Sequence, residues 1–160
     1  MSFIAQAPNP STVTEPPVEP IVVNDGWFPD IDPAHLRSAT RLNGTVTPER
    51  LALTLAAAII AVNSELQALK AQQLANGSTK LEDVLAPKVG DQSIKLYLYQ
   101  RAVYSTVQAD LVDRYRDFDT TGVGDKHADD LMPTADTLRR DVRWAISDLI
   151  GIRRTTVELI

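Results

Sequence analysis

The residues with the clearest chemical potential are the acidic ones between positions 117 and 125, in the run Asp-Phe-Asp-Thr-Thr-Gly-Val-Gly-Asp. Oxygen-bearing side chains at loop positions 1, 3, 5 and 9, with glycine at position 6, form the pattern of a calcium-binding EF-hand loop. The twelfth position, which holds a bidentate glutamate in such loops, is Ala128. A calcium-binding helical module is therefore one hypothesis, and a polar loop without a bound ion is the favoured interpretation. The ligands in the calcium hypothesis are Asp117, Asp119, Thr121 and Asp125.

A second possible chemistry is contact with DNA phosphates through the arginines of one helical stretch. Arg139, Arg140 and Arg143 lie within five residues, which gives the hypothesis of a DNA-binding helical protein. Two acidic residues, Asp136 and Asp141, are close enough along the helix to pair with them. The net charge of −5 and the isoelectric point near 4.9 also argue against a large phosphate-neutralising surface. A salt-bridged helix face is the favoured interpretation.

Patterns for catalysis or for a bound cofactor are missing from the sequence. His35 and His127 are far apart and neither has a histidine or glutamate at the fourth following position, so a zinc site is not expected. Gly122-Val123-Gly124 lacks the third glycine of a dinucleotide-binding fingerprint. No nucleophile elbow or phosphate loop occurs. We therefore expect a protein that is not an enzyme and holds no cofactor.

Composition indicates one domain with tails. The chain has 160 residues and no cysteine, which fits a reducing compartment. The apolar run from Leu51 to Val62 is too short to span a bilayer, and no signal peptide is evident. We expect a soluble protein made in the cytoplasm, with no membrane partner.

The N-terminal residues differ sharply in character from the rest. Proline fixes an extended φ and removes a backbone donor, so this part of the chain is expected to be an extended arm covering residues 1–29. Six of the ten prolines lie in it: Pro8, Pro10, Pro16, Pro17, Pro20 and Pro29.

Start and stop signals predict an all-α bundle of three long helices plus short helices in residues 30–151. Asp32-Pro33 begins a short helix over 34–41, and Thr47-Pro48 begins a long amphipathic helix that ends at Gly77. A structured loop with a helical turn around 81–85 follows. The second long helix covers 93–116 and has two apolar stripes. The third starts between Lys126 and Pro133 and ends at Gly151.

Residues 152–160 are expected to form an extended or β-like C-terminal tail, because β-branched residues are frequent there. Such a tail can add to a strand edge on another chain. We expect both tails to bind neighbouring subunits or other proteins. The candidate partner-binding residues are Trp27, Phe28 and Pro29, which anchor the arm, and Arg153, Arg154, Val157 and Leu159 in the tail.

Several fragments, in collinear order from about Phe28 to Ile160, together resemble one family. They are Trp27-Phe28-Pro29-Asp30-Ile31-Asp32-Pro33, Ser93-Ile94-Lys95, Tyr99-Gln100-Arg101-Ala102-Val103, Arg114-Tyr115-Arg116, Gly124-Asp125-Lys126 and Arg140-Asp141-Val142-Arg143-Trp144-Ala145. With these the chain resembles the head completion proteins of temperate contractile-tailed phages of the Peduovirus kind.

The resemblance implies a structural protein of the virion that is made in the host bacterial cytoplasm. Such a head-to-tail connector adds to the portal protein after DNA packaging, closes the filled capsid and provides the platform for a tail-joining or tail-terminator protein. It also implies a helical fold repeated in a ring of twelve copies. An acidic lumen would let viral DNA pass without specific binding. No enzymatic activity is implied.

Overall fold

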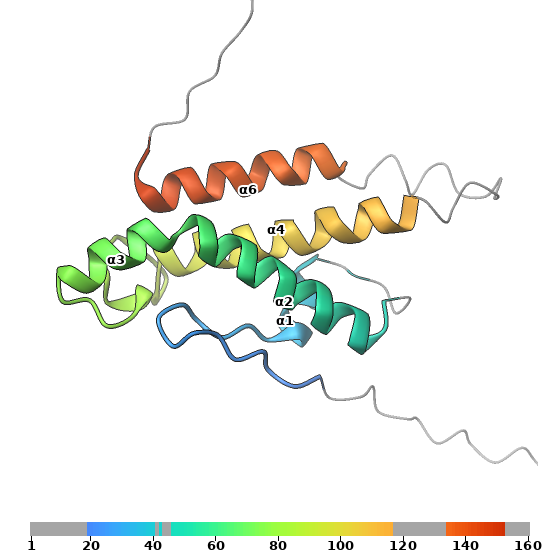
Figure 1. The fold of residues 1–160 in the computed structure, drawn as a ribbon, viewed down its shortest axis with the longest axis horizontal. Coiled ribbons are helices and arrows are strands. Elements are labelled where there is room, and N and C mark those ends of the chain that lie inside the picture. The colour runs from blue at the N-terminus through green and yellow to red at the C-terminus, as the bar shows by residue number, and fades with distance from the viewer. Residues whose placement is uncertain (1–18, 41, 43–45, 117–133, 153–160) are drawn as a thin grey trace, which may run out of the picture.

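The computed structural model describes residues 19–40, 42, 46–116 and 134–152, and five α-helices contain most of these described residues (Figure 1). They are α1 (Pro33–Thr40), α2 (Pro48–Glu65), α3 (Gln67–Ala75), α4 (Ile94–Arg116) and α6 (Ala135–Ile150). The short elements are the 3₁₀ helix η1 (Leu81–Asp83) and the strands β1 (Lys88–Val89) and β2 (Gln92–Ser93). The expected mostly helical fold is confirmed.

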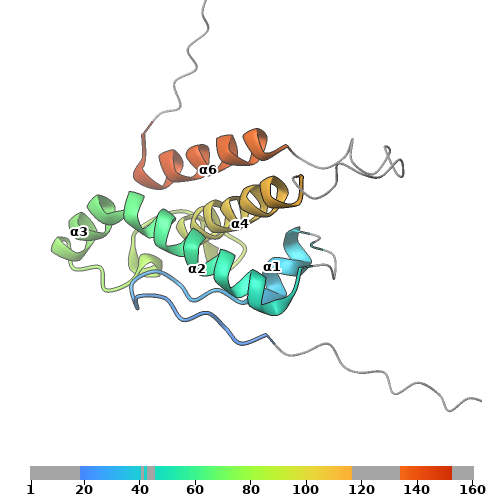
Figure 2. The same ribbon diagram turned by 45° about the vertical axis from the view of Figure 1, so that its right-hand side comes forward.

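The long helix α4 lies at the centre of the molecule. In both views α6 runs along one side of α4, while α2 and α1 lie on the other side (Figures 1 and 2). This position explains its two apolar stripes, because a helix packed on two sides must be apolar on two faces. Tyr99, Val103 and Val107 are fully buried, as are Leu55 on α2 and Leu149 on α6.

Local signals in the sequence fix most of the helix ends. The Asp32 carboxylate accepts the Ala34 N–H at 2.9 Å, ahead of Pro33 in the first turn of α1. Thr47 caps α2 in the same way, accepting the Arg50 N–H at 3.4 Å. Gly151 ends α6 with φ of 84°, a left-handed conformation that glycine adopts without strain. These predicted ends are confirmed.

The expectation of one helix from Pro48 to Gly77 is wrong. The chain breaks at Leu66, and α3 continues at 59° to α2. At the break the Leu66 N–H lies 3.1 Å from the Val62 carbonyl oxygen and 3.2 Å from that of Asn63. Leu66 and Leu69 are both buried, so the bend keeps the apolar stripe on the core beyond the end of α2.

Two further details differ from expectation. The third long helix begins at Ala135, after the expected range, because Thr134 is its N-cap and accepts the Thr137 N–H at 3.2 Å. The expected structured loop contains η1, as predicted, and also a small hairpin in which Lys88 pairs with Ser93 and Val89 with Gln92. Gly90, with φ of 61°, supplies the positive φ that a two-residue hairpin loop requires.

Residues 19–32, here called the docked segment, lie against the helical body. Val22 and Ile31 form an antiparallel bridge with both backbone hydrogen bonds, 2.9 and 3.0 Å long. Trp27, Phe28 and Ile31 are buried in the main core. Contact with the helices therefore begins at Glu19, which pairs with Arg37 of α1, and the segment stays extended at the bridge.

Candidate functional site

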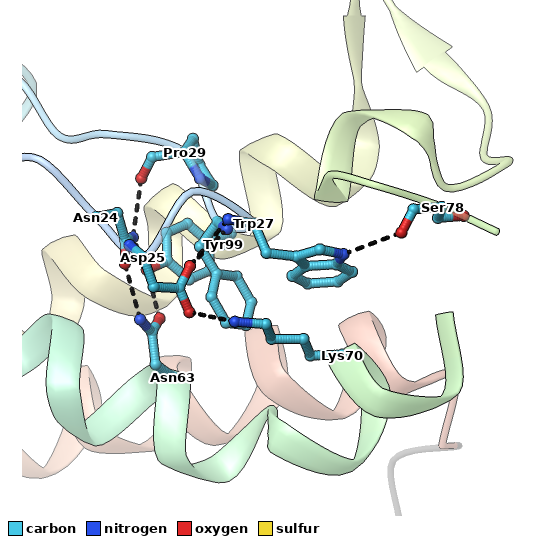
Figure 3. Close-up of polar contacts among 9 residues, drawn as sticks. Asn24, Asp25, Trp27, Pro29, Asn63, Lys70, Ser78 and Tyr99 are labelled. Atoms are coloured by element: carbon cyan, nitrogen blue, oxygen red, sulfur yellow. Dashed lines mark hydrogen bonds and ion pairs between the residues drawn. The ribbon is translucent and has the colours of Figure 1, made fainter. Parts of the chain in front are cut away.

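A tight turn places the two aromatic side chains of the docked segment. One oxygen of the Asp25 carboxylate accepts the N–H of Trp27 at 3.0 Å and that of Phe28 at 3.1 Å. Gly26 has φ of 83° within this turn, a conformation that costs most other residues free energy. The turn thus directs Phe28 to Tyr99 of α4 and Trp27 to the loop after α3. Figure 3 shows the Trp27 indole reaching toward Ser78.

The rings join three separate parts of the fold. Phe28 stacks on Tyr99 of α4, with ring centroids 4.9 Å apart and planes 13° apart. Trp27 meets the Phe28 ring edge-on at 4.7 Å, and its indole N–H donates to the Ser78 carbonyl oxygen at 3.3 Å. The Leu81 N–H donates to the Trp27 carbonyl oxygen at 2.9 Å. The docked segment is therefore held by α4 and by the loop that follows α3.

Three polar side chains close a ring of hydrogen bonds beneath these aromatics. The Asn24 amide donates to the Tyr99 hydroxyl at 2.8 Å, and that hydroxyl donates to the Asn63 side-chain oxygen at 2.7 Å. The Asn63 amide returns a hydrogen bond to the Asn24 side-chain oxygen at 2.8 Å. Burial raises the pKa of Tyr99 well above its ordinary value, even though the Asn24 hydrogen bond opposes this. The phenol thus stays neutral and keeps both of its roles, donor and acceptor.

Two ion pairs hold the docked segment, one at its central turn and one at its N-terminal end. The Lys70 ammonium contacts the second oxygen of Asp25 at 2.6 Å. Burial pushes the pKa of Asp25 upward, but hydrogen bonds from Lys70 and from the backbone of Phe28 and Trp27 outweigh it and leave the pKa lowered. At the other end, Arg37 donates to both oxygens of Glu19, at 2.8 and 2.6 Å, and to the Val46 carbonyl oxygen at 2.8 Å.

We call the contacts of Asn24, Asp25, Trp27 and Phe28 with Asn63, Lys70 and Tyr99 the latch. Of the expected arm residues, Trp27 and Phe28 belong to the latch, and their side chains are 3% and 2% exposed. Pro29 is half-buried, and its carbonyl oxygen accepts a hydrogen bond from the Asn24 amide. The two rings thus anchor the arm to its own body. Sequence reasoning missed Asn24, Asn63 and Lys70; the Asn-Asp-Gly turn was the one local signal.

The remaining expected site residues lie outside the described residues. This applies to the tail residues Arg153, Arg154, Val157 and Leu159, and to the loop with Asp117, Asp119, Thr121 and Asp125. Partner binding by the tail and calcium binding by the loop stay predictions. Among the described residues, no group of three or more acidic or histidine side chains is placed to hold a metal ion.

The arginines proposed for DNA contact are largely engaged within the protein. Arg139 pairs with Asp113 on α4 and, at 3.7 Å, with Asp136 one turn away on α6. The Arg140 guanidinium lies over the Trp144 ring, 4.8 Å from its centroid. Asp141 pairs with Arg101 of α4 at 3.3 Å, rather than with an arginine of its own helix. The Arg139–Asp113 and Arg101–Asp141 pairs cross-link α6 and α4.

The described surface carries exposed apolar side chains instead of an enclosed cavity. Leu53 and Ile60 are 68% and 70% exposed on one face of α2, and Ile21 and Val23 are 60% and 77% exposed on the docked segment. A shallow polar depression beside the β1–β2 hairpin is lined by Glu82, Lys88, Asp91 and Tyr97 among others. Apolar side chains of this kind mark a protein–protein contact surface where they join into one contiguous patch.

Hydropathy adds one observation on α2 and α3. Among the described helices, none is long and apolar enough on its own to cross a membrane, whereas α2 and α3 taken together meet the length and composition criterion despite the bend between them. Leu51, Leu55 and Val62 on α2 are buried in the core of the described residues.

The described residues form a mostly helical fold whose docked segment is held by the latch. The sequence model of the phage head completion protein (GPL) family matches residues 22–160. The head completion/stabilization protein of Escherichia phage P2 is 41% identical over 142 residues, which cover 89% of this chain and 84% of the relative. No solved structure matches the chain. The chain therefore belongs to the phage head completion protein family, whose members are structural components of the virion head.

Proposed function

We propose that this protein is the adaptor subunit that binds the portal vertex after DNA packaging, closes the filled capsid and forms the platform for a tail-joining or tail-terminator protein. The observation that carries the proposal is the family match over residues 22–160. Residues 22–32 of the docked segment lie in the matched region, as do all the residues of the latch. We propose no catalytic role and no cofactor.

The distribution of apolar side chains supports a role in assembly. Every buried side-chain nitrogen or oxygen in the described part of the chain has a hydrogen-bond partner. No buried polar side chain there requires a partner protein to supply its hydrogen bond. Leu53 and Ile60 on α2, in contrast, are large apolar side chains that lie mostly outside the core of the described residues. Burying them against copies of the chain or against the portal would gain roughly 25 cal/mol per Å² of apolar surface.

The subunits are proposed to form a ring of twelve copies around the DNA channel. Weak contacts repeated around a ring yield a durable assembly, because each added contact is intramolecular once the first has formed. The net charge of −5 favours passage of DNA without specific binding. The DNA-binding alternative is less well supported, since Arg139 and Arg140 are engaged by neighbouring side chains.

DNA retention by packaged heads tests this function. Heads packaged without the protein should lose DNA to nuclease, and purified protein added before nuclease should restore protection. A variant lacking residues 153–160 should keep its helical circular dichroism spectrum but fail to protect. Heads that retain their DNA equally well with and without the protein would contradict the proposed function. Full protection by the truncated variant would remove the tail from the proposal.

A further inference from the structure

The docked segment presents a strand edge that the other described residues leave unpaired. Val22 uses its N–H and its carbonyl oxygen to pair with Ile31. Because successive residues of a strand point their backbone groups to opposite edges, the N–H and carbonyl groups of Ile21 and Val23 face away from Ile31. They form no hydrogen bond with another described residue. Four backbone groups are therefore available to a further strand.

The side chains on this edge also lack cover. Ile21 and Val23 point to the same face because side chains alternate along a strand. They are 60% and 77% exposed, whereas Val22 between them packs against the core. Two exposed β-branched side chains on an unpaired edge form an unusual surface, because protein edges are commonly protected by charge, by bulges or by covering segments.

The chain itself contains a segment with the matching pattern. Residues 153–160 read Arg-Arg-Thr-Thr-Val-Glu-Leu-Ile. In an extended conformation Val157 and Leu159 fall on one face, at the same spacing as Ile21 and Val23. Apolar cross-strand pairs of this kind stabilise a pair of strands. The preceding arginines complement the exposed carboxylates Asp30 and Asp32 beside the bridge.

The positions of the two surfaces favour a neighbouring subunit over the same subunit. In both views α6, which leads into the tail, lies on the opposite side of α2 and α4 from the docked segment (Figures 1 and 2). Eight residues after Ile152 reach at most about 26–29 Å when fully extended, and a tail of the same chain would have to pass around the helical body. A second copy placed beside the first needs no such path.

We infer that the tail of one subunit, residues 153–160, adds as a strand to the Ile21–Val23 edge of the next subunit. Such a contact joins two different surfaces, so it repeats from copy to copy and closes into a ring when the rotation allows. The inference rests on the proposed ring of subunits and names the contact that links them. Backbone hydrogen bonds supply affinity, and the pairing of Val157 and Leu159 with Ile21 and Val23 supplies register.

Disulfide trapping between two different chains tests this contact, because the protein has no cysteine of its own. A full-length Val23→Cys variant is mixed with a full-length Val157→Cys variant that carries a size tag, both as purified protein and on isolated portals. Mild oxidation should give a heterodimer as the main covalent product. The matched control is Val23→Cys with Glu158→Cys, whose thiol lies on the other face of the tail strand and should give little product.

Two double variants test whether the heterodimer depends on the Ile21–Val23 edge in particular or on the exposed surface of the subunit in general. Ile21→Lys combined with Val23→Lys should abolish the heterodimer and reduce subunit association without changing thermal stability, because both side chains are exposed. Ala68→Lys combined with Ala71→Lys adds the same charge at two exposed positions on α3 and should leave the trapped pair intact.

The outcomes distinguish this contact from the proposed function. Binding to portals without any heterodimer would overturn the inference and leave the function standing. Heterodimer formation by a protein that neither binds portals nor seals heads would support the contact and contradict the function. A double variant with both cysteines that forms the bond only within one chain, or a Val157→Cys tail that cross-links only to the portal, would also overturn the inference. Failure to cross-link in every preparation has the same consequence.

Discussion

The Tyr99 hydroxyl donates to the side-chain oxygen of Asn63 at 2.7 Å, and this hydrogen bond joins α4 to α2 directly beside the docked segment. Asn24 completes the ring by bonding to both. Each hydroxyl or amide in the ring donates one hydrogen bond to another member and accepts one, so removing any member leaves a partly buried polar group without its partner. The latch is therefore expected to respond sharply to small changes.

Replacing Tyr99 by phenylalanine removes one hydroxyl and leaves the stacking with Phe28 in place. The Asn24 amide keeps its bond to the Pro29 carbonyl, but the Asn63 oxygen loses its donor. We expect the free energy of unfolding to fall by about 1–3 kcal/mol, measured by urea denaturation. Tyr97→Phe is the matched control, because Tyr97 is 45% exposed and its substitution should change stability little. Equal stability of the two variants would mean that the ring of hydrogen bonds contributes nothing.

Phe28→Ala tests whether the arm anchor acts within the subunit or toward a partner. The ring is 2% exposed and lies on Tyr99, so its removal should cost about 3–5 kcal/mol of unfolding free energy. Leu85→Ala provides the control, since Leu85 is 99% exposed. A Phe28→Ala variant as stable as the parent protein, but unable to bind portals, would show that Phe28 serves a partner instead.

Acid should weaken the latch through Asp25. Its pKa in the folded protein is lowered below the ordinary 3.8, so the unfolded chain takes up the proton first as the pH falls. The stabilisation is present above about pH 4 and is lost as the pH drops through the folded-state pKa. Asp25→Asn should therefore flatten the fall in the urea midpoint on acidification. Some slope should persist, because hydrogen bonding from Thr79 also lowers the pKa of Asp83. An unchanged slope in the variant would contradict this role of Asp25.

Arg37 should hold the N-terminal residues of the docked segment, from Glu19 onward, against the helices. Arg37→Met removes two hydrogen bonds to Glu19, whose side chain is 8% exposed, and one to Val46. Loss of charged hydrogen bonds of this kind costs about 1.5–3 kcal/mol. Amide hydrogen exchange at Val22 should accelerate. Lys80→Met, which breaks the exposed pair with Glu82, should leave that exchange unchanged, and similar rates in both variants would argue against the assignment.

The helix ends were predictable because their causes are local. Asp32 before Pro33, Thr47 before Pro48 and Gly151 after the last turn act within a few residues of their own positions. The break at Leu66 was not predictable, since the apolar spacing continues unchanged through it. The hairpin was not predictable either, because its two strands have only two residues each and give no alternating pattern.

The latch shows why the candidate site was only partly predictable. Trp27 and Phe28 were recognised as important from their place at the end of the proline-rich region, but their burial depends on Tyr99, more than seventy residues away along the chain. Hydrogen bonds between Asn24 and Asn63 likewise have no signature in a single sequence. Long-range contacts of this kind become visible only once the helices are placed.

Electron microscopy of isolated portals mixed with the purified protein tests the central claim most directly. The account predicts an added ring of density on the portal with the rotational symmetry of a twelvefold assembly, and the same ring weakened or missing for the Ile21→Lys, Val23→Lys variant. Portals that look the same with and without an excess of the folded protein would contradict the proposal that this chain is the adaptor that closes the head.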